Sequence, residues 1–237
     1  AGANTYSGST GVNAGALVLS GSLASEVLTV ASGTSFEVTP TGALPIATVL
    51  TANGVVMFRS IAMELLTLNG GGTGSVTLDG TALTVSNGIY GGVIANGTGS
   101  GSLTKTSSGT LTLSGANTYT GSTLVDAGTL ALTGTGRLAS TVLTVSAGAK
   151  LSVGSSALVP TDAVVTADGI VELGASAVTL LTLDGAASGR VTLEGTTLTL
   201  SNGTFAGVIR DGATAGSLVK TSSGTLTLSG ANTYTGS

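Results

Sequence analysis

Short runs in which apolar and polar residues alternate recur along the whole chain, each just after a glycine. The run Thr-Leu-Thr-Leu follows Gly109 and Gly224, and Arg-Val-Thr-Leu follows Gly189. Apolar residues two apart share one face of a strand, and the residues between them suit solvent. Such glycines are 17 to 21 residues apart, and a second apolar run, such as residues 142–145, falls between successive glycines. The pattern therefore predicts two short strands in each unit.

The spacing favours an all-β, parallel β-solenoid with about 12 coils of roughly 19 residues each. A single coil cannot bury its apolar face, but stacked coils bury a continuous core. We expect the apolar residues two and four positions after the glycines to face inward. These predicted core residues are Leu17, Leu19, Val76, Leu78, Leu111, Leu113, Leu130, Leu132, Val191, Leu193, Leu226 and Leu228.

A longer repeat of about 114 residues is superimposed on the coils. Residues 105–122 and 220–237 are identical, and residues 2–6 are a third, partial copy of Gly115 to Tyr119. We predict one continuous solenoid over residues 1–237, with long repeats at 1–113 and 114–228 and the start of a third at 229–237. Both ends carry the same motif, and neither end resembles the polar cap that a solenoid ordinarily needs.

The repeated Gly-Ala-Asn-Thr-Tyr motif admits two interpretations, a ligand-contact patch or a structural turn. The structural interpretation is favoured, because Asn tolerates left-handed turns and hydrogen-bonds to neighbouring backbone, while Tyr can cover a corner with its hydroxyl in water. The residues concerned are Asn4, Tyr6, Asn117, Tyr119, Asn232 and Tyr234. The Asn-Gly pairs at residues 87–88 and 202–203 are also predicted to form turns.

Composition excludes several functional classes. The 237 residues include no Cys, His or Trp, only 8% are charged, and the net charge of −4 offers no basic stripe for nucleic acid. No apolar run is long enough to cross a bilayer as a helix. The 41% of hydrophobic residues argues against disorder. Without His or Cys, a zinc site is not expected.

Candidate catalytic groups are sparse. Two pairs of acids, Asp162 with Asp168 and Asp184 with Glu194, could approach each other across neighbouring coils, but a hydrolytic or calcium site needs several converging charges. Glu172 and Arg190 are predicted to form a surface ion pair. We therefore expect no enzyme activity, no metal and no cofactor.

Outward threonines raise the hypothesis of an ice-binding array. The set comprises Thr110, Thr112, Thr129, Thr225 and Thr227. Charged and aliphatic residues at adjacent outward positions interrupt the array, and threonine is favoured in strands for other reasons.

Residues 102–123 and 126–132 resemble the autotransporter-associated β-strand repeat of Gram-negative surface proteins, and residues 217–237 and 2–19 share the likeness. The sequence departs from that family where Ser107-Ser108 precedes Gly109 and where Ser122 follows Gly121. The resemblance implies a right-handed β-helix exported to the cell surface, outer-membrane-attached or secreted. It implies no activity by itself.

Together these features predict a structural extracellular segment, a stiff stalk or scaffold of an autotransporter-like or adhesin protein. The alternative is a self-assembling subunit of an extracellular fibre or sheath that stacks head to tail through uncapped ends. A glycan-binding or ice-binding surface is a further alternative. The expected partner is the chain itself, by stacking or by covalent continuation of the array, with a host or neighbouring-cell surface as another candidate.

Overall fold

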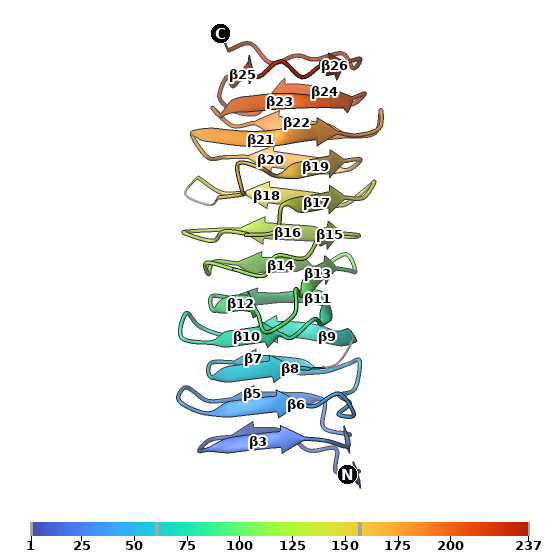
Figure 1. Ribbon diagram of the computed structural model, residues 1–237, viewed down its shortest axis with the longest axis vertical. Coiled ribbons are helices and arrows are strands. Elements are labelled where there is room, and N and C mark those ends of the chain that lie inside the picture. The colour runs from blue at the N-terminus through green and yellow to red at the C-terminus, as the bar shows by residue number, and fades with distance from the viewer. Residues whose placement is uncertain (1, 60–61, 156–157, 237) are drawn as a thin grey trace.

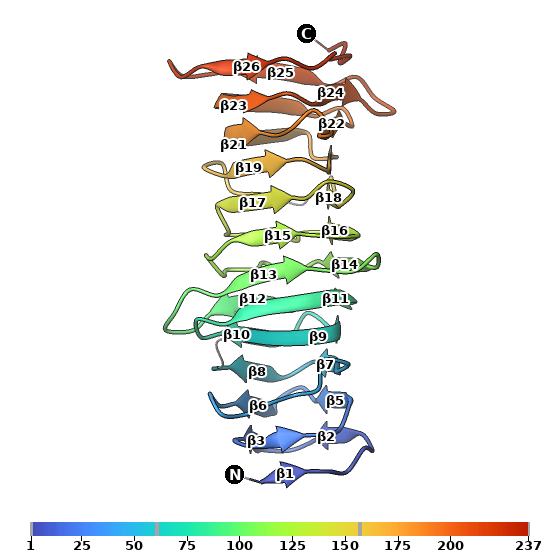
Figure 2. The same ribbon diagram turned by 90° about the vertical axis from the view of Figure 1, so that its right-hand side faces the viewer.

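The computed structural model describes residues 2–59, 62–155 and 158–236. It confirms the right-handed parallel β-solenoid, with about 11 turns rather than 12. The turns stack into a column that has the two chain ends at opposite ends (Figures 1 and 2). Residues 62–69 lie in one long strand. The described ranges contain no helix that could cross a membrane.

One face of the column is a parallel ladder in which each strand pairs with the strand of the next coil. From the N-terminal end its strands are β2 (Thr10–Val12), β5 (Val27–Val30), β7 (Val49–Ala52), β9 (Ala62–Asn69), β11 (Ala82–Tyr90), β13 (Ser102–Lys105), β15 (Thr123–Val125), β17 (Val142–Val145), β19 (Val164–Ala167), β21 (Ala177–Asp184), β23 (Thr197–Phe205) and β25 (Ser217–Lys220).

The opposite face is built from two successive ladders. The first contains β3 (Ala16–Leu19), β6 (Ser35–Val38), β8 (Val55–Phe58), β10 (Ser75–Leu78) and β12 (Val93–Asn96). The second contains β14 (Thr110–Leu113), β16 (Thr129–Leu132), β18 (Lys150–Val153), β20 (Ile170–Leu173), β22 (Arg190–Leu193) and β24 (Val208–Asp211), and β26 (Leu226–Leu228) lies at the C-terminal end. A short pair, β1 (Ala3–Asn4) with β4 (Ser22–Leu23), lies at the N-terminal end.

The register of the parallel strands places similar residues of neighbouring coils opposite each other. Leu111 pairs with Leu130, Leu130 with Leu151, and Leu151 with Val171, so the inward aliphatics form continuous stacks. All four are at most 2% exposed. Burying one such side chain contributes about 1.5–3 kcal/mol, so the core stack is the main stabilising element of the column.

Most of the predicted core residues are buried: Leu19, Val76, Leu78, Leu111, Leu113, Leu130, Leu132, Val191 and Leu193. Three are not. Leu17 is 37% exposed, which is a correction to the prediction, and Leu226 and Leu228 are only partly buried. These residues lie on β3 and β26, each of which pairs with a strand on one side only. Burial in a solenoid comes from the coil above and the coil below, and the end coils lack one of them.

The two Asn-Gly pairs do not form hairpin turns, contrary to the prediction. Asn87-Gly88 lies inside β11 and Asn202-Gly203 inside β23. Gly88 has a φ of +142°, and a Cβ built on it would lie 2.0 Å from the carbonyl oxygen of Leu68 in the coil below. The glycine lets a continuous strand bend around a corner of the column while its backbone touches the next coil.

The coil that contains the central copy of the Gly-Ala-Asn-Thr-Tyr motif, residues 115–119, joins the two ladders of the opposite face. β14 does not lie on β12 but on residues 88–90 of β11. The place next to β12 is taken by Thr118, whose backbone N–H donates to the Ile94 carbonyl at 2.8 Å. The motif therefore marks the position where the cross-section of the solenoid changes.

Candidate functional site

Asn117 of the central motif connects three successive coils. Its Oδ1 accepts the backbone N–H of Ile94 at 3.0 Å, and its Nδ2 donates to the carbonyls of Gly115 and Arg137 at 3.1 Å each. The side chain is 1% exposed. Because this buried amide fully uses its oxygen and nitrogen, it stabilises the coil junction and is not available to a ligand. Among the described residues, only Ser107 and Ser222 are non-glycine residues with positive φ, so the expected left-handed Asn does not occur.

Tyr119 is buried completely, which corrects the expectation that its hydroxyl lies in water. The hydroxyl lies 2.7 Å from Oγ1 of Thr123 on the next strand. Burial raises the pKa of Tyr119 well above its usual value, and the Thr123 hydrogen bond opposes that shift only in part. The phenol therefore stays neutral and acts as part of the core.

The motif copies at the two ends have the same residues in different surroundings. Asn4 is exposed and Tyr6 is 49% exposed, whereas Asn232 and Tyr234 are partly buried. Tyr6 still pairs its hydroxyl with Oγ1 of Thr10 at 2.8 Å. The structure does not bring the three copies together into one patch, because each lies in a different part of the column.

Lys105 is a buried cation that the sequence reasoning missed. Its side chain is fully buried, and Nζ donates to the carbonyls of Thr106, Ser107 at 2.9 Å and Ala127 at 3.0 Å. Burial lowers the pKa of Lys105. The signal was present in the sequence, because Lys105 stands two residues after the inward Leu103 and so faces the core.

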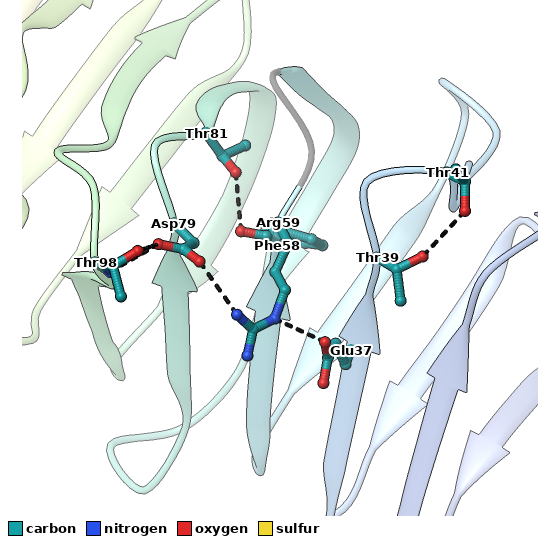
Figure 3. A network of polar contacts seen from close by, with 8 residues as sticks. All are labelled: Glu37, Thr39, Thr41, Phe58, Arg59, Asp79, Thr81 and Thr98. Atoms are coloured by element: carbon teal, nitrogen blue, oxygen red, sulfur yellow. Dashed lines mark hydrogen bonds and ion pairs between the residues drawn. The ribbon is translucent and has the colours of Figure 1, made fainter.

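A polar network on the surface surrounds Arg59 (Figure 3). Arg59 Nε lies 2.7 Å from Oε1 of Glu37, and its Nη1 lies 3.2 Å from Oδ2 of Asp79. The Thr98 hydroxyl, together with the backbone N–H groups of Thr98 and Gly99, holds the pKa of Asp79 below its usual value. The network connects neighbouring coils at the surface, where such ion pairs contribute little each.

The predicted acidic pairs do not form a site. Asp168 accepts the Ala186 N–H at 2.7 Å, Asp184 the Thr204 N–H at 2.7 Å, and Glu194 the Ala213 N–H at 2.8 Å. Each carboxylate thus binds the backbone of the next coil. In the described ranges, no group of three His, Cys, Asp or Glu residues could hold a metal.

The predicted pairing of Glu172 with Arg190 is wrong. Register sets Glu172 opposite Ser152 and Thr192, and sets Arg190 opposite Ile170. Glu172 instead pairs with Lys150, with 2.7 Å between Nζ and Oε2.

The outward threonines do not continue as an array. Thr110 pairs with Thr129, but the next residues in that row are Lys150, Ile170 and Arg190. The row therefore changes from hydroxyl to charged and aliphatic side chains within a few coils, which is a poor match to a regular lattice.

Comparison with known proteins gives one family. No curated protein and no solved structure matches the chain. A protein-family model does match the chain at all three copies of the motif, in agreement with the resemblance seen in the sequence. The segments at residues 1–19, 103–132 and 218–237 match the passenger-associated-transport-repeat.

Proposed function

We propose that this chain is a stiff structural rod in a passenger region displayed on the surface of a Gram-negative bacterium, and that it performs no catalysis. The observation that carries the proposal is the single hydrophobic core cluster, which continues from coil to coil between the two faces of the column. The passenger-type repeat supports the location outside the cell. Among the described residues, the buried polar side chains Asn117, Tyr119 and Lys105 hydrogen-bond within the column, where they stabilise contacts between coils.

Stiffness follows from how neighbouring coils are joined. Most coils are held to the next by backbone pairing on both faces of the column, and side-chain hydrogen bonds join several of them. Thr67 Oγ1 donates to Asn87 Oδ1 at 3.0 Å, and Thr182 Oγ1 donates to Asn202 Oδ1 at 2.8 Å. Bending the column would separate coils on one side and break these bonds together with the core contacts.

The outer faces give less support to the other roles. The threonine row is interrupted, which disfavours ice binding. A glycan-binding adhesin ordinarily uses exposed aromatic side chains, and this chain has 3% aromatic residues and no Trp. Of its tyrosines, Tyr90 and Tyr119 are buried.

Two measurements test the proposal. Small-angle scattering of the purified chain should give a rod about 50 Å long, from about 11 turns at roughly 4.8 Å each. Antibodies raised against the folded chain should label intact cells of the source bacterium, and the intact mass of the antigen should greatly exceed 22.5 kDa if the rod is a stalk. Labelling only after lysis would refute the surface role.

A further inference from the structure

Asparagine followed by glycine occurs at three places in the column besides the pairs at residues 87–88 and 202–203. The asparagine of such a pair can react with its own chain, because glycine has no Cβ to hinder attack of its backbone nitrogen on the side-chain amide. The three further pairs are at residues 53–54, 69–70 and 96–97. Their counterparts 115 residues later in the second long repeat are Asp-Gly, at 168–169, 184–185 and 211–212.

The amide and the acid make the same bond at equivalent positions. Asn53 Oδ1 accepts the N–H of Gly71 at 2.9 Å, and Asp168 Oδ1 accepts the N–H of Ala186 at 2.7 Å. Ala186 is the counterpart of Gly71 in the second long repeat. The geometry of the coils therefore accepts a carboxylate in place of the carboxamide without any new partner.

Asn96 is the last residue of β12, and its side-chain carbonyl is polarised by two donors. Its Oδ1 accepts the backbone N–H of Gly101 at 2.9 Å and that of Thr120 at 3.3 Å. Two N–H groups on one oxygen stabilise the negative charge that this oxygen carries once a nucleophile attacks the carbon beside it. In the described ranges, each of the other four Asn-Gly side chains accepts one hydrogen bond at Oδ1.

Gly97 is the one exposed glycine of the five pairs, all of which lie in the described ranges. The atom nearest to a Cβ built on Gly97 is a side-chain atom, Oδ1 of Asp79, at 2.9 Å, whereas at the other four glycines it is a backbone carbonyl oxygen of another coil. Gly97 also lines a surface hollow of about 190 Å³ beside Arg59 and Asp79, which admits water. Its N–H donates to the Leu78 carbonyl at 2.8 Å, and this bond has to open before the nitrogen can attack.

We propose that Asn96 is a deamidation site at which the folded column converts an Asn-Gly linkage into Asp-Gly. The Gly97 nitrogen attacks Cγ of Asn96 and gives up its proton to water. The bond between Cγ and Nδ2 then breaks, ammonia leaves with a proton from water, and a cyclic imide remains. Water adds to one imide carbonyl and opens the ring at that carbon. Opening at Cγ gives aspartate, and opening at the backbone carbonyl gives isoaspartate, so each conversion consumes one water and releases one ammonia.

Asp211 shows how the aspartate product fits. Its Oδ1 accepts the N–H of Gly216 at 2.7 Å, and its Oδ2 accepts the N–H of Thr235 at 2.9 Å. These two donors are the counterparts of Gly101 and Thr120. A carboxylate at residue 96 therefore has the same two backbone donors as the carboxamide that it replaces, and its bonds to them are charge-assisted.

The added negative charge also has a precedent in the second long repeat. Glu194 Oε1 is the atom nearest to a Cβ built on Gly212, as Asp79 Oδ1 is for Gly97. Glu194 and Asp211 are thus two acids at the positions where the converted chain would have Asp79 and an acid at residue 96. In the first repeat, Arg59 Nη1 lies 3.2 Å from Asp79 Oδ2 and offsets part of the new charge.

Peptide mapping by mass spectrometry tests the proposal on the folded chain. After incubation in mildly alkaline buffer, digestion and fragmentation locate each asparagine that has exchanged its NH₂ for OH. Residue 96 should convert at least about tenfold faster than residues 87 and 202, whose glycines are packed on backbone and whose amides have one donor. Conversion at residue 96 that is no faster than at residues 87 and 202 would overturn the proposal.

A denaturant control separates the effect of structure from that of sequence. In the unfolded chain all five asparagines precede glycine without any coil contacts, so they should convert at similar rates. A preference for residue 96 that persists in denaturant would show that the contacts of Asn96 are not its cause, and would refute the argument.

Two variants test the nucleophile and the product. Gly97→Ala leaves the carboxamide bonds of Asn96 in place but adds a Cβ beside the attacking nitrogen, so conversion at residue 96 should slow while the other four sites keep their rates. An unchanged rate would exclude attack by residue 97. Asn96→Asp should unfold at the same urea concentration as the original chain, and a clear decrease would show that the product does not fit. Neither result depends on where the protein resides in the cell, so these tests and surface labelling can fail independently.

Discussion

The hydroxyl of Tyr90 is buried and has no hydrogen-bond partner among the described residues. The side chain is fully buried at the end of β11, and the built Cβ of Gly92 would lie 2.5 Å from its hydroxyl oxygen. The equivalent position 115 residues later is Phe205, which has the same bridge to a glycine one coil below. The second long repeat thus shows that the site accepts a ring without the oxygen.

The substitution Tyr90→Phe should stabilise the protein by about 1–2 kcal/mol. An unpaired buried hydroxyl costs about 1–3 kcal/mol of desolvation, and its removal leaves only a small gap beside the ring. Since 1 kcal/mol shifts the melting temperature of a chain of this size by about 2–4 °C, the expected increase is about 2–8 °C. Urea titration followed by circular dichroism gives the free energy directly.

Two further substitutions serve as controls for Tyr90→Phe. Phe205→Tyr adds the unpaired hydroxyl at the equivalent position and should destabilise by a similar amount. Tyr119→Phe removes a hydroxyl that is paired with Thr123, and it should cost about 0.5–1.5 kcal/mol. The reasoning is refuted if Tyr90→Phe and Tyr119→Phe change the free energy of unfolding in the same direction.

Three other predictions concern pH and backbone contacts. Burial lowers the pKa of Lys105, so just below pH 10.5 the unfolded chain binds more protons than the folded chain, and the free energy of unfolding should rise with pH there. In denaturant titrations, the variant Lys105→Met should lose that rise, and the control Lys220→Met should keep it. Asp79 has a lowered pKa, so its contribution should be present above pH 3.8 and disappear as pH falls through the folded pKa, and Asp79→Asn should flatten that part of the acid unfolding curve. Gly88→Ala places a Cβ 2.0 Å from the backbone of the coil below and should lower the free energy of unfolding by more than about 3 kcal/mol. The control Gly71→Ala, whose Cβ would lie 3.7 Å from its nearest neighbour, should have little effect. Equal melting temperatures for the two variants would contradict the contact argument.

The repeating core could be read from the sequence because it depends on a local pattern. Alternation after each glycine is enough to identify Leu111, Leu113 and Leu130 as inward residues. The exposure of Leu17 could not be read in that way, because burial depends on whether a coil lies on both sides and not on the residue's own sequence context.

Side-chain partners across coils were harder to predict. Ile170 is opposite Lys150 on one side and Arg190 on the other, so Glu172 lies two residues along its strand from the row that holds both cations. It pairs with Lys150, and alternation along the sequence does not say which of two diagonal neighbours a long side chain reaches. The burial of Tyr119 was missed for a related reason. Its hydroxyl partner, Thr123, lies on the next strand, and the sequence does not show that the two side chains meet. The Asn-Gly pair at residues 87–88 was predicted to form a turn from its preference for tight hairpins. That preference is no guide where one strand bends around a corner of the column, as β11 does.

The separation between paired strands has a consequence for how this column folds. Partners such as Ser75 and Val93 are 18 residues apart, and Asn96 and Thr120 are 24 apart, in a chain of 237 residues. The relative contact order is therefore on the order of 0.1, as in helical bundles, and well below that of most all-β proteins. Each coil needs only a short loop to pair with the coil next to it, so folding can start at one coil and add neighbouring coils one after another. A β-rich chain of this kind should fold quickly, and its end coils should be the first to exchange their amide hydrogens.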